Sequence, residues 1–369
     1  MRSLLKPSVA LNALLSASLS LALVHAQQRG QIQQNQQQNA ASPPLEILPI
    51  RGNVYMLAGA GGNIAVSVGP DGVLMVDTGT LQNADRVLAA VQQLQKQLAT
   101  NGLPEWNYAA QTRSNLPRMI SPPAAPKPIR YIINTSMDPD HTGGNEKLSR
   151  AGRTLTGGNV AGSIADASEG SSVIAHENVL QRMSSTANKQ AALPFRALPT
   201  DTYYGASMKL SHFMNGEGIL ITHQPSAHTD GDSIVYFRGA DVIVAGDIFR
   251  MDTYPVVDIE RGGNIQGVID GLNRILDMSI AEFRTEGGTM IIPGHGRLTD
   301  SADVAYYRDM VTIIRDRIQD MVKKGQSLEQ IKAARPTRDY DPRFGSTTGP
   351  YTTDMFIEAV YQSLIQKRK

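Results

Sequence analysis

Four short segments of the sequence place histidine or aspartate directly after apolar runs. They hold Asp138, Asp140 and His141 in NTSMDPDHTGGN, His228 in SAHTDGD, Asp247 in VAGDIF and His295 in PGHG. Glycine-rich turns beside rigid strands can hold imidazole and carboxylate groups in the fixed directions that a divalent metal requires. The chain has no cysteine, so any metal ligands must be oxygen and nitrogen atoms. These residue types and positions predict a metal site.

Three apolar runs near the start of the folded region predict an antiparallel β-structure. The runs are EILPIRGNVYMLAG, GNIAVSVG and GVLMVDTG, and Gly-Pro-Asp-Gly at 69–72 is a hairpin signal between the last two. The glycine-rich stretch 59–63 does not fit a dinucleotide phosphate loop, because Ile64 stands where the third glycine is needed and a strand follows. We therefore assign this stretch to a β-turn.

Helical spacing of apolar residues is clear over 83–99 and over 303–325, and Gly325 is the expected C-cap of the second helix. A capping box of Ser327 and Gln330 predicts a further helix, and another is predicted over 173–183. The segments GILITHQPSAHTDGDSIVYF and DVIVAGDIF predict short buried strands that end in polar residues. Sites of layered α/β folds gather at such strand ends.

Three segments lack a core-forming pattern. Residues 1–26 predict a secretory signal cleaved after Ala26, because Arg2 and Lys6 precede an apolar stretch. Residues 27–44 are rich in glutamine and asparagine, and we expect a disordered linker. The expected product is periplasmic or secreted, without membrane association after cleavage. Residues 100–126 contain five prolines, which indicates a functional lid or a solvated insertion.

The charges of the chain are nearly balanced, with 35 Lys and Arg against 34 Asp and Glu and a formal net charge of +1. This balance gives no electrostatic reason to expect nucleic acid as a partner. The sequence has no G-x-S-x-G motif, so a serine hydrolase has no support. We expect a small-molecule substrate, and the oligomeric state stays open.

The four segments, in this order and spacing, resemble the metallo-β-lactamase superfamily. The family pattern is T-H-x-H-x-D-H-x-G-G-N, then a third histidine after a strand, then G-D and G-H. The resemblance extends from about residue 45 to 369 and includes Asp77 in VDTG as the family's early buried aspartate. Within the superfamily, the chain is similar to an exported bacterial branch. It implies an α+β fold, a four-layer αββα sandwich over 45–300, with a helical extension over 301–369 packed on the same domain.

The departures from the family pattern fall in one of its two metal sites. The family's first metal site takes three histidines, which correspond here to Ser136, Asp138 and His228. Its second site corresponds to Asp140, His141, Asp247 and His295, all of which carry family ligand types. We therefore expect the second site to bind a metal and the first to be weak or empty, with one zinc ion favoured over two. A carboxylate at 138 also occurs in flavodiiron relatives, which leaves iron or manganese open.

Metal-assisted hydrolysis of a lactone, ester, thioester or amide is the activity that this resemblance implies. A bound ion lowers the pKa of water toward about 7 and polarises a carbonyl, while Asp140 or Asp138 acts as general base. Two alternatives stay open: a non-catalytic ligand-binding protein with a damaged metal site, and a non-heme iron oxidoreductase.

Other polar residues are expected to be structural. Three histidines fall on no family ligand position, namely His176, His212 and His223. Three tyrosines near the motifs are expected to pack, with donation to an oxyanion as the alternative, namely Tyr203, Tyr204 and Tyr254.

Overall fold

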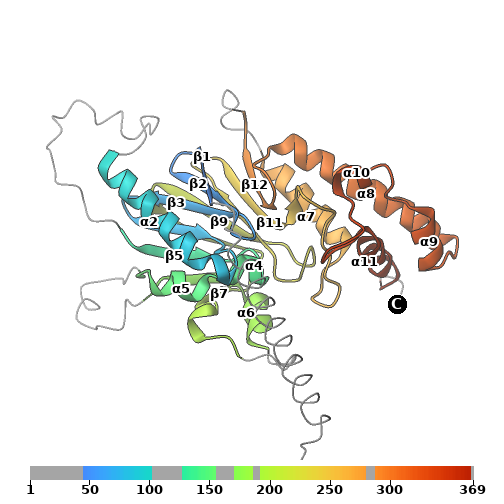
Figure 1. Cartoon of the computed structure of the whole chain (residues 1–369), viewed down its shortest axis with the longest axis horizontal. Helices are drawn as coiled ribbons and strands as arrows, with labels where there is room; N and C mark the ends of the chain where they lie inside the picture. The colour runs from blue at the N-terminus through green and yellow to red at the C-terminus, as the bar shows by residue number, and fades with distance from the viewer. Residues whose placement is uncertain (1–44, 102–126, 155–169, 186–191, 280–286, 367–369) are drawn as a thin grey trace, which may run out of the picture. The chain divides into compact units, whose positions relative to one another are not determined.

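The computed structural model describes residues 45–101, 127–154, 170–185, 192–279 and 287–366 (Figure 1). The predicted signal segment, the predicted linker and residues 102–126 of the proline-rich segment lie outside the described residues. The described residues belong to one compact unit that begins at Leu45. None of their helices is long and apolar enough to cross a membrane.

The first sheet has seven strands in sequential order. They are β1 (Glu46–Arg51), β2 (Val54–Ala58), β3 (Ile64–Gly69), β4 (Gly72–Val76), β5 (Ile129–Ile133), β6 (Ser172–His176) and β7 (Asp201–Tyr203). β1 to β4 pair antiparallel, and the hairpin predicted at 69–72 joins β3 to β4. β4 to β7 run parallel, so their carboxyl ends lie at one edge of the sheet.

The second sheet has five strands in the order β12-β11-β10-β9-β8. They are β8 (Ser207–Met214), β9 (Glu217–His223), β10 (Ser233–Phe237), β11 (Val242–Arg250) and β12 (Met290–His295). Neighbours pair antiparallel except β11 and β12, which run parallel. Asp247 and His295 therefore lie toward the same end of two adjacent strands.

The two sheets pack face to face between outer layers of helices (Figure 1). In β4, Leu74 and Val76 enter the core between the sheets, whereas Val73 and Met75 enter the core under helix α2 (Ala84–Asn101). This alternation follows from the two-residue period of a strand. Helices α7 (Ile265–Met278) and α8 (Ser301–Lys323) cover the other sheet. The predicted αββα sandwich is confirmed.

The C-terminal helices share a hydrophobic core with the second sheet and α7. After α8 come α9 (Leu328–Ala334), α10 (Asp341–Phe344) and α11 (Thr353–Gln366). The predicted capping box of Ser327 and Gln330 begins α9. The fully buried ring of Phe356 in α11 stacks on Tyr254, with 4.7 Å between ring centroids. The extension therefore packs on the sandwich through apolar side chains.

The helix predicted over 173–183 is wrong in its first part. Val173, Ile174 and Ala175 belong to β6, and helix α6 begins at Glu177 and ends at Ser184. All three side chains are buried because β6 lies between two parallel neighbours under covering layers. A short, wholly apolar run of this kind cannot be assigned by periodicity alone.

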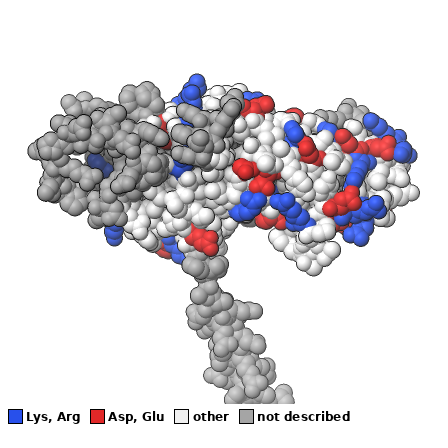
Figure 2. Space-filling view, turned by 90° about the horizontal axis from the view of Figure 1, so that it is seen from above, with Lys and Arg blue, Asp and Glu red and all other residues white. Residues whose placement is uncertain are grey.

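Acidic and basic side chains are interspersed on the face drawn in Figure 2. Neither sign forms a separate broad patch over the described residues on that face.

Candidate metal centre

The loop after β5 carries Asp138, Asp140 and His141 at the short helix α4 (Pro139–Thr142). Asp138 precedes the helix in extended conformation, and Pro139 occupies its first position, where no backbone N–H is needed. The backbone N–H of Thr78 donates to the carbonyl of His141 over 2.7 Å. The end of β4 and the loop after β5 are thus tied together.

Asp77 fixes the orientation of the His141 ring. Its backbone has a left-handed φ of 65°, and its carboxylate accepts hydrogen bonds from the backbone N–H (2.8 Å) and hydroxyl (2.6 Å) of Thr135. The same carboxylate lies 2.7 Å from Nδ1 of His141. Because a carboxylate only accepts, Nδ1 carries the hydrogen, and Nε2 is left as the ligating nitrogen.

The second sheet supplies His228, Asp247 and His295. His228 lies in the loop between β9 and β10, and its Nδ1 donates to the carbonyl of Val256 over 2.8 Å. Asp247 follows an irregularity of β11 at Gly246, whose φ is 53°. Such irregularities redirect the side chains that follow. His295 is the last residue of β12.

The structure brings the predicted ligands together in two groups. In each group the ligand atoms lie within 4.8 Å of one another, and the groups are Asp140, His141 and His295, and Asp138, His228 and Asp247. Asp247 joins them, because its Oδ1 lies 3.4 Å from Nε2 of His141 and its Oδ2 lies 4.0 Å from Nε2 of His228. The four segments therefore form one centre.

The residues of the second site fit a metal ion. Nε2 of His141, Nε2 of His295 and Oδ1 of Asp247 are buried and have no hydrogen-bond partner among the described residues. Such atoms are rare and indicate an ion or water as their partner. Nε2 of His295 lies 3.1 Å from Oδ2 of Asp140 and 3.6 Å from Oδ1 of Asp247. Ligands around one tetrahedral ion with bonds of ~2 Å lie roughly 3.3 Å apart, so the spacing agrees.

The carboxylates create a negative potential at the centre. Burial alone would lower the pKa of His141, but the charges of Asp77 and Asp247 raise it well above its ordinary value. Burial would also lower the pKa of His228, but the hydrogen bond with Asp138 and the nearby carboxylates raise it to about 10. A potential that binds protons to imidazoles also favours a bound cation in their place.

The first-site positions lie beside the second site, but their polar atoms are paired. Ser136 is buried, and its hydroxyl accepts a hydrogen bond from the backbone N–H of Asp138 over 3.2 Å. Oδ2 of Asp138 lies 2.5 Å from Nε2 of His228. The structure therefore brings Ser136, Asp138 and His228 together, and their polar atoms are hydrogen-bonded to one another or to the backbone.

Sequence reasoning missed three residues that contact this centre. Arg250 contacts Asp247, Arg261 contacts Asp138, and Asn63 holds the His295 loop. Arg250 follows Asp247 by three residues, and this spacing alone does not identify it as part of the centre. Arg261 and Asn63 are distant in sequence from the groups they contact, so only the fold reveals them.

Asn63, at the end of the glycine-rich turn 59–63, bonds the loop that carries His295. Its side-chain amide donates to the carbonyls of Pro293 and Gly296, both over 2.9 Å, and its backbone N–H donates to that of Gly294. The preceding Gly62 lies so close to His141 that an added Cβ would stand 3.0 Å from Nε2. The stretch 59–63 is the bent connection between β2 and β3, and it supports the centre from one side.

Asn63→Ala is expected to lower the free energy of unfolding by about 1–3 kcal/mol, because the buried carbonyl of Pro293 and the more exposed carbonyl of Gly296 lose their donor. It should also weaken zinc binding, since the His295 loop is no longer held. Urea unfolding and zinc competition with a chromophoric chelator measure the two effects. Asn53→Ala, which removes one 3.4 Å bond to Asn215, is the matched control. Wild-type values for Asn63→Ala would contradict this role.

The remaining histidines and tyrosines take packing positions where they are described. The ring of His176 stacks on that of His223 with 3.5 Å between centroids, and burial, followed by the neighbouring His223, lowers the pKa of His176. Tyr203 is buried and bonds Ser233, and Tyr254 packs in the C-terminal core. Tyr204 is largely exposed. The side chain of His212 lies outside the described residues.

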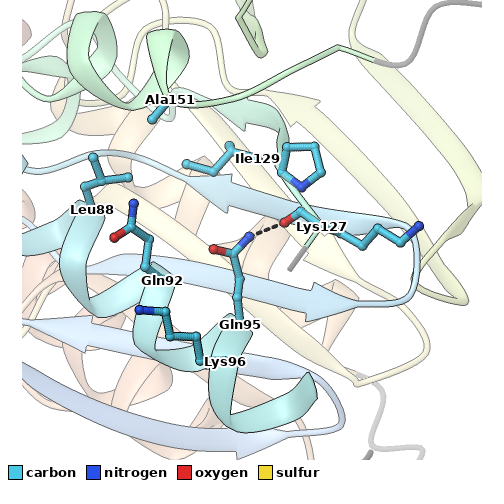
Figure 3. Close-up of a pocket in the computed structure, with 8 residues that line it drawn as sticks. Leu88, Gln92, Gln95, Lys96, Lys127, Ile129 and Ala151 are labelled. Carbon is cyan, nitrogen blue, oxygen red and sulfur yellow. Dashed lines mark hydrogen bonds between the residues drawn. The ribbon is translucent and has the colours of Figure 1, made fainter. Parts of the chain in front are cut away.

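A surface pocket of about 430 Å³ lies elsewhere, between α2 and the start of β5 (Figure 3). Its lining includes Leu88, Gln92 and Lys96 of α2, and Ile129, the first residue of β5. The candidate centre follows the opposite end of β5. The pocket therefore forms no part of it.

Comparison with known proteins gives one family match and several structural likenesses. A family model described as the metallo-beta-lactamase superfamily matches residues 57–295. The sec-alkylsulfatase Pisa1 from Pseudomonas sp. aligns at 14% identity with a TM-score of 0.51, covering 86% of this chain and 50% of its own. The DIM-1 metallo-beta-lactamase aligns at 16% identity and a TM-score of 0.47, covering 73% and 98%. Curated protein sequences gave no match. At these identities the sulfatase likeness supports the fold alone.

Proposed function

The chain belongs to the metallo-β-lactamase superfamily, and from this membership we propose that it is an exported, metal-dependent hydrolase. The observation that carries the proposal is the convergence of three buried ligand atoms, from His141, His295 and Asp247, that have no hydrogen-bond partner in the described part of the chain. Asp140 completes the set at the solvent side, where its side chain is 34% exposed. The substrate class proposed is a lactone, ester, thioester or amide.

One zinc ion at the second site is the proposed cofactor. Its ligands would be Asp140, His141, His295 and Oδ1 of Asp247, a set of two imidazoles and two carboxylates. The chemistry that such an ion supplies is polarisation of a substrate carbonyl and acidification of water to a pKa of about 7. Asp77 holds the Nδ1 proton of His141 and so keeps the ring in the ligating tautomer.

Asp140 is the proposed general base, through the carboxylate oxygen that would not be bound to the ion. It is partly exposed, and the neighbouring His295 and His141 outweigh the effect of burial and lower its pKa, so it is ionised at neutral pH. Asp138 is the weaker candidate because both of its oxygens already have partners, His228 and Arg261. The iron oxidoreductase alternative rests on the carboxylate at 138, and in the structure this carboxylate is bonded to His228 and Arg261.

The test is chelation of the exported protein. Protein recovered without added metal should contain zinc and hydrolyse at least one chromogenic lactone, ester, thioester or β-lactam. Dialysis against a chelator should remove both the zinc and the turnover, and added zinc should restore both. A ligand-binding protein would instead show stabilisation by its ligand that survives chelation. Turnover that persists in metal-free protein would overturn the proposal.

A further inference from the structure

The ligand atoms of the first site have protein partners, whereas three ligand atoms of the second site have no hydrogen-bond partner among the described residues. Nε2 of His228 contacts Oδ2 of Asp138 at 2.5 Å, and the hydroxyl of Ser136 accepts from the Asp138 backbone. The second oxygen of Asp138 and the second oxygen of Asp247 each accept from a guanidinium. In the described part of the chain, the first site is therefore filled by hydrogen bonds within the protein, whereas three atoms of the second site are left for an ion.

Arg261 reaches Asp138 from a loop that is bonded to the His228 segment. Nη1 of Arg261 lies 2.9 Å from Oδ1 of Asp138. The backbone N–H of Asp258 donates to the carbonyl of His228, and an Asp258 carboxylate oxygen accepts from the Arg261 backbone over 3.0 Å. Gly263 follows so closely that an added Cβ would stand 2.2 Å from the His228 carbonyl oxygen. These contacts hold the backbone of the loop against the His228 segment and so place Arg261 beside Asp138.

Arg250 occupies the side of Asp247 that faces the first site. Its Nη1 donates to Oδ2 of Asp247 over 3.1 Å, and its Nε and Nη2 each lie 3.2 Å from the carboxylate of Asp252. The side chain is only 13% exposed. Oδ2 is the oxygen that lies nearer His228, and Oδ1 is the one directed to His141 and His295. Arg250 thus leaves Asp247 with one free oxygen, directed to the second site.

We propose that Arg250 and Arg261 take the place of the first metal ion and make this a one-metal protein. If Asp247 were to join two ions through its two oxygens, Oδ2 would be the oxygen available to the first ion. Here Arg250 donates to that oxygen, and Arg261 neutralises the carboxylate of Asp138. The inference rests on the proposed function, because it presumes a metal in the second site.

This arrangement predicts that histidines alone do not restore a first site. Ser136→His/Asp138→His returns the family ligands but leaves both cations nearby. Arg250 stays bonded to Asp247, and Arg261, whose side chain is 39% exposed, keeps its contact with Asp258. Like charges close together repel a divalent ion. Removing the guanidinium charges as well should open the site. Methionine is a suitable replacement, because it keeps an unbranched apolar stem without the charge.

The experiment measures zinc per chain by mass spectrometry after equilibration with zinc and removal of the free ion. The samples are the wild type, Ser136→His/Asp138→His, and that pair combined with Arg250→Met and Arg261→Met. We expect about one zinc in the first two and about two in the third. The pair combined with Arg317→Met is the control and should hold about one, since Arg317 bonds Asp339 and the carbonyl of Pro336 in the C-terminal extension.

Two zinc ions in the wild type or in Ser136→His/Asp138→His would overturn the inference and leave the proposed hydrolase intact. One zinc in a folded four-residue variant would overturn it as well. Circular dichroism checks folding, and if that variant does not fold, the comparison of the wild type with the histidine pair still decides. A wild type that binds no zinc would overturn the proposed function itself.

Discussion

His295→Ala and Asp140→Ala are each expected to lose both bound zinc and turnover. Each change removes one of four proposed ligands, and in His295→Ala the Oδ1 atom of Asp247 loses one of its two imidazole neighbours. Loss of a residue that only supports a ligand costs metal sites about 10–100-fold in affinity, so loss of a ligand should cost at least about 100-fold. Zinc content after purification and competition with a chelator measure this loss without reference to any substrate.

A control for these variants is His223→Ala. It removes an imidazole in the same part of the chain, but one whose ring stacks on His176 and whose Nε2 donates to the carbonyl of Asp230. We expect it to keep wild-type zinc content. If Asp140→Ala and His295→Ala both retained zinc and full turnover, the second site would not be the functional centre. If they lost zinc but kept turnover, the metal would be structural.

The predicted features of the fold were those with strong local signals. The hairpin at 69–72 carries Gly-Pro-Asp-Gly between two strands, and the helix found at Ser301–Lys323 carries a long apolar stripe and is followed by Gly325 with a left-handed φ of 76°. β6 was missed because Val173, Ile174 and Ala175 are all apolar, and a fully buried strand has no alternation to detect. Its burial depends on parallel neighbours that are distant in sequence, a tertiary effect.

The candidate ligands were found from sequence because each follows a strand in a short turn, and the ends of neighbouring strands lie together. The resemblance to the family implied that Asp138 lies with His228 and Asp140 with His295, and the structure groups them in this way. What the sequence could not show was the pairing that fills the first site. Arg261 lies 123 positions from its partner, and its role depends on how one loop folds against another.

This pairing changes how the departures at 136 and 138 are understood. Taken alone, the loss of two histidines indicates damage to a metal site. In the structure, Asp138 accepts hydrogen bonds from both His228 and Arg261, and Ser136 bonds its backbone. A carboxylate with two cationic partners is compensated electrostatically, and a buried charge without such partners would be costly. Ser136, Asp138 and Arg261 are therefore linked by hydrogen bonds that stabilise this part of the centre.

The other large expected effect is that of Asp77→Ala, which should lower the free energy of unfolding of the metal-free protein by about 3–5 kcal/mol. The carboxylate is buried and accepts three hydrogen bonds, two from Thr135 and one from His141. Alanine leaves these donors without an acceptor and also stands at a left-handed φ that it adopts poorly. Urea unfolding in the presence of a chelator measures the loss apart from any metal contribution.

Asp77→Asn separates the support of the fold from the support of the metal site. Asparagine tolerates the left-handed φ and keeps an oxygen acceptor for Thr135, so its loss of stability should be the smaller. It has no negative charge to hold the Nδ1 proton of His141, so its zinc affinity should still fall about 10–100-fold. Wild-type zinc affinity in Asp77→Asn would mean that the carboxylate serves the fold alone. Equal loss of stability in both variants would mean that the charge, and not the bond to Thr135, holds this part of the fold together.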